Sequence, residues 1–92
     1  MDKRLLYKIR VTGRVQGVGF RHSTVNEAKK LDLTGYVKNL ADGSVYIEAE
    51  GLKEQLDALV EWCRTGPGMS SVESVSPDIS APAGHKEFRV KY

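Results

Sequence analysis

Alternating apolar and polar residues predict a half-buried strand over residues 5–12, at the start of the chain. The side chains on one side of this run are Leu5, Tyr7, Ile9 and Val11, and those on the other are Leu6, Lys8 and Arg10. The same period of two predicts a strand over residues 44–50, and a further strand is predicted over residues 34–40. Asp42-Gly43 stands between these two runs, and this dipeptide strongly favours a hairpin turn.

Two more strands are expected in the last quarter of the chain. One runs from residue 72 to about residue 79, and Pro77 either ends it or places it at an edge of the sheet, because proline cannot donate to a ladder. A short final strand is indicated by a second alternation, that of Phe88, Val90 and Tyr92.

Two amphipathic helices interrupt the strands. Residues 21–31 carry apolar side chains three apart, at Val25, Ala28 and Leu31, with polar residues between them. Residues 53–64 follow a stripe typical of a core-facing helix, made by Leu52, Leu56, Leu59, Val60 and Cys63. The order βαββαβ plus a last strand predicts an α+β, ferredoxin-like sandwich. A mainly antiparallel sheet of four to five strands would carry both helices on one face.

This topology makes the first two strands parallel, so their carboxyl ends should lie at the same edge of the sheet. The first strand ends in a loop, residues 13–21, that holds three glycines and an arginine at each side. Amides that curl ahead of a helix form a concave anion site, and arginine matches phosphate geometry. The second strand ends at Asn39, which shares the face of Val37 and should therefore point toward the start of the first helix.

Composition narrows the range of functions. The chain has 92 residues, which predicts one domain over residues 1–92, and a net charge of +2, which is too mild to indicate nucleic acid. Cys63 is the only cysteine, so no intrachain disulfide is expected, and its place on a core stripe indicates a buried side chain rather than a nucleophile. No export signal and no membrane partner are expected, and the predicted location is cytoplasmic.

A resemblance to the acylphosphatases is carried by three stretches of the chain: Val15-Gln16-Gly17-Val18-Gly19-Phe20-Arg21, Gly35-Tyr36-Val37-Lys38-Asn39 and Asp42-Gly43. It covers nearly the whole chain. A glycine-rich loop alone would be weak evidence, but its combination with Asn39, eighteen residues after Arg21, is specific.

The resemblance implies a hydrolase that cleaves carboxylic–phosphoric mixed anhydrides without a metal or cofactor. By the same resemblance, Arg21 binds the phosphoryl group and Asn39 orients the attacking water. The backbone amides from about Gln16 to Phe20, through Gly17, Val18 and Gly19, cradle the phosphoryl oxygens. The implied partners are a small acyl phosphate as substrate and inorganic phosphate as product and competitive inhibitor, and a monomer is the expected state.

Other polar residues are expected to have lesser roles. Asp32 stands where the family commonly has glycine, which predicts some backbone strain at the end of the first helix. His22 is expected to point away from the site of Arg21, since one residue along a helix turns a side chain by about 100°. Arg14 is more typical of a solvated cation. His85, in a polar loop, and the outward-facing Glu48 and Glu50 are expected to be solvated.

Two alternatives from other classes remain open on the sequence. RNA-recognition domains share this topology and stack bases on exposed aromatic residues. The open face of the predicted sheet carries Tyr46, but Glu48 and Glu50 beside it would repel a phosphate backbone. The other alternative is a phosphate sensor without turnover. Asn39 distinguishes it from an enzyme, since a sensor needs no amide that orients water.

Overall fold

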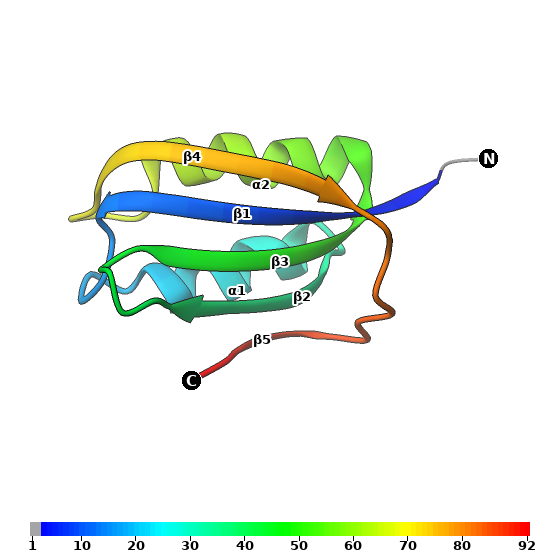
Figure 1. Cartoon of the computed structure of the whole chain (residues 1–92), viewed down its shortest axis with the longest axis horizontal. Helices are drawn as coiled ribbons and strands as arrows, with labels where there is room; N and C mark the ends of the chain where they lie inside the picture. Colours follow the sequence, from blue (N-terminus) through cyan, green and yellow to red (C-terminus); the bar gives the residue numbers. More distant parts are fainter. Residues whose placement is uncertain (1–2) are drawn as a thin grey trace.

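The computed structural model describes residues 3–92 and contains five strands and two helices (Figure 1). In chain order they are β1 (Arg4–Arg14), α1 (Phe20–Lys30), β2 (Thr34–Asn39), β3 (Val45–Leu52), α2 (Lys53–Thr65), β4 (Ser71–Ser80) and β5 (Phe88–Val90). Each predicted element is present, and its bounds differ from the prediction by three residues or fewer. No helix within residues 3–92 is long and apolar enough to cross a membrane.

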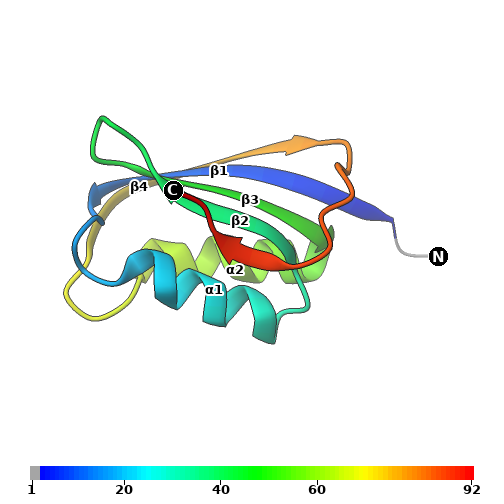
Figure 2. The ribbon, with the colours of Figure 1, turned by 90° about the horizontal axis from the view of Figure 1, so that it is seen from below.

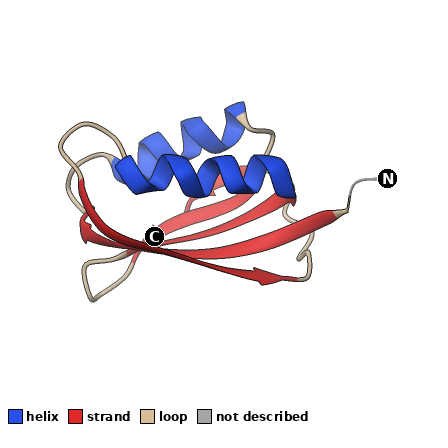
Figure 3. Ribbon diagram, turned by 90° about the horizontal axis from the view of Figure 1, so that it is seen from above, coloured by secondary structure: helices blue, strands red, loops and turns tan. Residues whose placement is uncertain are grey.

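The strands form a single sheet in the order β4-β1-β3-β2-β5. β1 pairs antiparallel with β3 and β4, and β2 pairs antiparallel with β3, so β1 and β2 run in the same direction. Both helices lie on one face of this sheet (Figures 2 and 3). The ferredoxin-like α+β fold is therefore confirmed. β4 is an edge strand, which accommodates Pro77.

The core lies between the sheet and the helices. It includes the fully buried side chains Ile9, Val11, Val37, Val45, Ile47, Leu56, Leu59 and Cys63. On α1 the buried side chains are those of Phe20, Thr24 and Ala28, four residues apart, while Val25 and Leu31 are only partly buried. The Thr24 hydroxyl donates to the carbonyl of Phe20 at 2.7 Å, which satisfies it within its own helix.

The face of the sheet away from the helices is covered in part, contrary to the prediction. Glu50 is buried and Glu48 is only partly exposed. Residues 81–87, which connect β4 at one edge to β5 at the other, pass over this end of the sheet, and the backbone amides of Ala83 and Gly84 bond to the Glu50 carboxylate. Leu6, paired with Glu50 in the sheet, is also buried on this face.

The end of α1 shows the strain that the sequence predicts. Asp32 has a φ of 57° and is the only non-glycine residue with positive φ in the described part of the chain. Side chains with a Cβ atom rarely adopt this left-handed conformation, although aspartate is among those that tolerate it. Asp32 therefore marks a turn at which glycine would be less strained.

Candidate functional site

The loop between β1 and α1 presents backbone amides ahead of a helix. Gly17 has a φ of 73°, and Gly19, the residue that caps α1, has a φ of 80°. These left-handed conformations favour glycine, and a Cβ at either position would meet open space, so the backbone and not packing requires glycine here. Within residues 3–92, no backbone carbonyl pairs with the amides of Gly17, Val18 or Gly19. These amides are free to bind a ligand.

The Gln16 side chain fixes the loop in place. Its Nε2 donates to the carbonyl oxygens of Leu40 at 2.8 Å and Ser44 at 2.9 Å, both in the turn between β2 and β3. That turn is held in its own right, since the Asp42 carboxylate accepts from the Ser44 amide at 2.9 Å. The sequence pointed to the backbone of Gln16 alone. The structure adds a side chain that ties the loop to the end of β2, where Asn39 lies.

A cavity of about 200 Å³ opens between the loop, the end of β2 and the residues that end the chain. Its lining consists of Val15, Gly17, Gly19, Phe20, Arg21, His22, Asn39, Val90 and Tyr92. Five of the predicted site residues thus meet at one cavity, whereas Gln16 and Val18 are not part of its lining. Arg14 also lies outside it and is exposed.

Arg21 and Asn39 both carry polar groups without a protein partner. Arg21 belongs to no ion pair within residues 3–92, and its guanidinium lies 5.2 Å from the centre of the Tyr92 ring. The Asn39 Oδ1 is buried and accepts no hydrogen bond from any of the residues that the structure describes. Buried polar atoms nearly always have a partner, because desolvating one without compensation costs about 1–3 kcal/mol. An unpaired cation and an unpaired acceptor in one cavity indicate a place for an anion and a hydrogen-bond donor.

Four lining residues were not predicted as site residues: Val15, His22, Val90 and Tyr92. The prediction that His22 points away from the site of Arg21 is wrong, since His22 lines the same cavity. β5 pairs parallel with β2, with Val37 opposite Val90, and the Lys91 amide donates to the Val37 carbonyl at 2.8 Å. This pairing carries the last residues of the chain to the end of the sheet at which the β1–α1 loop lies (Figure 1). The alternation of Phe88, Val90 and Tyr92 predicts the strand, but it contains nothing that identifies the neighbouring strand.

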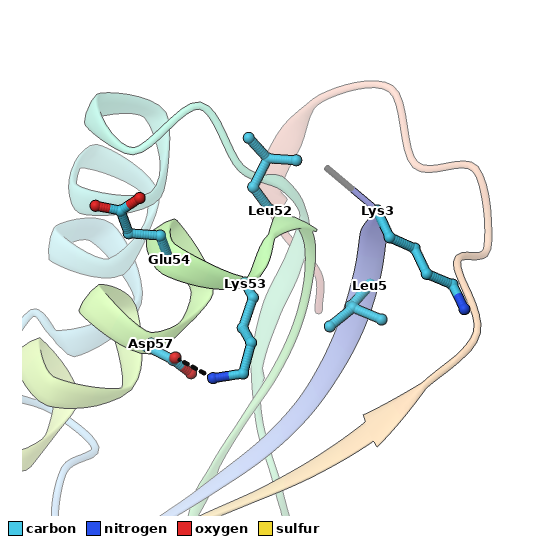
Figure 4. Close-up of a pocket in the computed structure, with 6 residues that line it drawn as sticks. All are labelled: Lys3, Leu5, Leu52, Lys53, Glu54 and Asp57. Carbon is cyan, nitrogen blue, oxygen red and sulfur yellow. Dashed lines mark hydrogen bonds and ion pairs between the residues drawn. The ribbon is translucent and has the colours of Figure 1, made fainter. Parts of the chain in front are cut away.

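A larger cavity, of about 560 Å³, lies at the opposite end of β1 (Figure 4). Its lining is Lys3, Leu5, Leu52, Lys53, Glu54 and Asp57. Here the Asp57 carboxylate already pairs with the Lys53 ammonium at 2.7 Å and accepts from the Tyr7 hydroxyl at 2.6 Å. Two of its charged side chains, Lys53 and Asp57, thus pair with each other, which distinguishes it from the cavity of Arg21. In the described part of the chain, no cluster of His, Cys, Asp or Glu side chains could hold a metal ion.

Comparisons with known proteins agree on one family. A family model described as acylphosphatase matches residues 7–90. The chain is 51% identical to an acylphosphatase of Salinibacter ruber over 83 residues, covering 89% of this chain and 87% of the relative. It is 48% identical to an acylphosphatase of Nostoc sp. over 81 residues, covering 88% and 80%. The crystal structure of acylphosphatase from Bacillus subtilis superimposes with a TM-score of 0.93 at 45% identity, covering 96% of this chain and 99% of that one.

The fold is thus a ferredoxin-like α+β sandwich with an arginine-lined cavity at the carboxyl ends of two parallel strands. The chain belongs to the acylphosphatase family. It is a hydrolase of that kind.

Proposed function

We propose that this enzyme hydrolyses the carboxyl–phosphate anhydride of small acyl phosphates, with Arg21 and the loop amides binding the phosphoryl group and Asn39 orienting water. The observation that carries the proposal is that Asn39, whose buried Oδ1 has no partner among the described residues, lines the same cavity as Arg21, which forms no ion pair there. The Oδ1 of Asn39 can accept a hydrogen bond from water, and the guanidinium of Arg21 can donate hydrogen bonds to a phosphoryl oxygen. The two groups together therefore match the two reactants.

Phosphoryl binding is assigned to the start of α1. The guanidinium of Arg21 can make two parallel hydrogen bonds to a phosphoryl group, and the amides from Gln16 to Phe20 add donors at the positive end of the helix dipole. The free amides of Gly17, Val18 and Gly19 support this assignment. These fixed donors would stabilise the charge that spreads over the equatorial oxygens in the transition state.

The chemical step is an attack of water on phosphorus. The water oxygen forms the new P–O bond while the bond from phosphorus to the acyl oxygen breaks, and the carboxylate leaves with the electron pair. Asn39 does not accept a proton at neutral pH, so a phosphoryl oxygen of the substrate takes the water proton. The Oδ1 of Asn39 accepts a hydrogen bond from that water and aligns it with the breaking bond.

No metal, cofactor or strong general acid is needed in this scheme, because a carboxylate is an excellent leaving group. The site binds only the phosphoryl group, so the enzyme should accept a broad range of acyl groups. Inorganic phosphate should be both product and competitive inhibitor. Burial raises the pKa of the Cys63 thiol to about 12, which speaks against a covalent thiolate route. We further propose that residues 1–92 act as one domain and as a cytoplasmic monomer, without a nucleic-acid or membrane partner.

A phosphate sensor without turnover is the competing function. It would use Arg21 and the loop amides, but it would leave the buried Oδ1 of Asn39 without a purpose. The proposal is tested by phosphate release from benzoyl phosphate and acetyl phosphate in the presence of a chelator. Wild type should turn over both substrates, whereas Arg21→Ala and Asn39→Ala should each lose about a hundredfold or more of kcat/KM. Arg21→Ala should also lose inhibition by inorganic phosphate.

Matched controls are available in the same chain. Arg14→Ala removes an exposed arginine near the loop but outside the cavity, and Asn26→Ala removes an exposed asparagine of α1. Both controls should keep turnover close to wild type. If wild type binds phosphate but releases none from the acyl phosphates, the sensor is favoured. Unchanged turnover in Arg21→Ala or Asn39→Ala would reject the assigned site.

A further inference from the structure

The sheet face away from the helices holds two carboxylates, Glu48 and Glu50, which we call the carboxylate anchor. Glu50 is only 3% exposed. Its Oε1 accepts hydrogen bonds from the backbone amides of Ala83 at 2.9 Å, Gly84 at 2.9 Å and His85 at 3.4 Å. Its Oε2 lies 3.7 Å from the Arg4 guanidinium. One side chain of β3 thus binds three consecutive residues of the connection between β4 and β5.

Glu48 holds the same connection through a side chain. Its Oε1 lies 2.9 Å from the His85 Nε2, and its Oε2 accepts from the hydroxyls of Tyr46 at 2.9 Å and Tyr36 at 3.1 Å. Burial by itself would raise the pKa of both glutamates, but these hydrogen bonds outweigh it, and the pKa of each lies below its ordinary value. Both groups are therefore carboxylates at neutral pH, when they accept hydrogen bonds most strongly.

The segment that the anchor holds leads directly into the candidate site. β5 is three residues long and joins the sheet only along β2. The Gly35 amide donates to the Glu87 carbonyl at 2.8 Å, where the connection meets β2. Beyond β5, the Tyr92 ring lies 5.2 Å from the Arg21 guanidinium, at the wall of the cavity. β5 is held by its pairing with β2 and by the buried side chain of Phe88, and the carboxylate anchor adds a third attachment just before it.

We propose that Glu50 is a positioning residue for the phosphoryl site: by fixing residues 83–85 it docks β5 on β2 and keeps the Tyr92 ring against Arg21. This inference rests on the proposed role of Arg21. The Tyr92 ring is 98% exposed, so its contact with the Arg21 guanidinium is an exposed cation–π contact that depends on where the residues after β5 lie. Release of β5 would remove this contact. Phosphate would then bind to a less ordered arginine, and its affinity would fall.

The test compares Glu50→Ala with Glu50→Gln and with Val60→Ala. Val60 is buried on α2 and lines neither the cavity nor the connection, so Val60→Ala lowers stability without touching the anchor. In Glu50→Ala the KM for benzoyl phosphate and the inhibition constant of inorganic phosphate should rise about two- to fivefold, the loss expected for one exposed cation–π contact, with a smaller change in kcat. Glu50→Gln should largely restore both, because its amide oxygen can accept the same bonds.

Limited trypsin cleavage after Lys86 and Arg89 supplies a readout that does not depend on turnover, and it should be faster in Glu50→Ala than in Val60→Ala. Faster cleavage with unchanged KM and phosphate affinity in Glu50→Ala would overturn the proposal, as would an equal rise of both constants in Val60→Ala. If Glu50→Ala does not fold, Glu50→Asp gives the same test, because its shorter side chain keeps the charge but not the reach to the amides of residues 83–85. A wild type without turnover would contradict the proposed function instead, and the dissociation constant of phosphate, measured by calorimetry, would still decide the role of Glu50.

Discussion

The cavity of Arg21 and the carboxylate anchor both remove polar groups from water, but they differ in whether those groups have hydrogen-bond or ion-pair partners. In the cavity, the buried Oδ1 of Asn39 has no partner, and Arg21 forms no ion pair in the described part of the chain. In the anchor, every carboxylate oxygen of Glu48 and Glu50 lies near a hydrogen-bond donor or a cation.

This difference distinguishes a candidate reactive site from a part of the molecule that stabilises the fold. A satisfied buried group contributes to stability, whereas an unsatisfied one costs about 1–3 kcal/mol until a ligand arrives. Such a cost often persists at functional sites, but not only there, since the buried Oε1 of Gln55 on α2 is also unpaired and lies outside the cavity. The cavity is distinguished by Asn39 and Arg21 lying there together. We therefore expect substitutions in the cavity to lower activity more than stability, and substitutions in the anchor to do the reverse.

The largest expected effect is that of Asn39→Ala, which should lose activity without losing stability. Turnover of benzoyl phosphate should fall about a hundredfold or more, since a group that aligns the nucleophile is lost. The free energy of unfolding should stay unchanged or rise by up to about 1 kcal/mol, because an unpaired acceptor is removed. Steady-state kinetics and urea unfolding of the same preparation check both. A clear loss of stability would mean that Asn39 is satisfied and structural.

Glu50→Ala should show the opposite pattern. Removing the carboxylate leaves the amides of Ala83 and Gly84 without their acceptor, so the free energy of unfolding should fall by about 2–3 kcal/mol. The kcat should change by less than about threefold, because Glu50 touches no reacting group. Urea unfolding measures the first and initial rates at saturating substrate measure the second. Unaltered stability would show that the anchor is not a stabilising structure.

Gly19→Ala tests whether phosphate binding at the cavity depends on the conformation of the loop. A Cβ at Gly19 meets no neighbouring atom, so only the positive φ opposes the substitution. The expected loss of stability is about 1–2 kcal/mol, together with weaker phosphate inhibition as the amides shift. Thermal unfolding with and without phosphate separates the two effects. Ser23→Ala, on the first turn of α1, is the control and should change neither.

The elements of the fold could be predicted because their patterns are local. Alternation fixes the face of each residue of β1, and the spacing of Leu56, Leu59 and Cys63 fixes the face of α2. The meeting of Arg21 and Asn39 was also predictable, since parallel strands end at the same edge of a sheet.

The burial of Glu48 and Glu50 could not be predicted in this way. Both residues alternate outward from β3, and only the path of residues 81–87, a loop without periodicity, covers them. The same limit applies to Tyr92, because a three-residue strand contains no information about its neighbour. The side-chain bonds of Gln16 were missed because they join a loop to a turn, and neither has a repeating pattern.

A smaller effect is expected when pH is lowered. The pKa of the Glu50 carboxyl lies below its ordinary value in the folded protein, because the bonds from residues 83–85 and the nearby Arg4 outweigh its burial. Its contribution to stability is therefore complete above the unfolded pKa, about 4.3, and is lost as pH falls through the folded pKa. Urea unfolding at a series of pH values should show wild type more stable than Glu50→Gln at pH 7. The difference should shrink toward about pH 3. A constant difference would show that charge at Glu50 plays no part.

The smallest expected effect belongs to His22, which lines the cavity but is exposed. A mechanism in which the substrate accepts the water proton needs no ionising side chain, so kcat should be nearly flat between about pH 5.5 and pH 7.5. His22→Ala should change kcat by less than about twofold, since the residue offers the reaction neither a proton nor a nucleophile. A steep pH profile that disappears in His22→Ala would make this histidine the general base. Asn39 would then act only by positioning another group. Unpaired polar groups would no longer distinguish the reactive cavity from the carboxylate anchor.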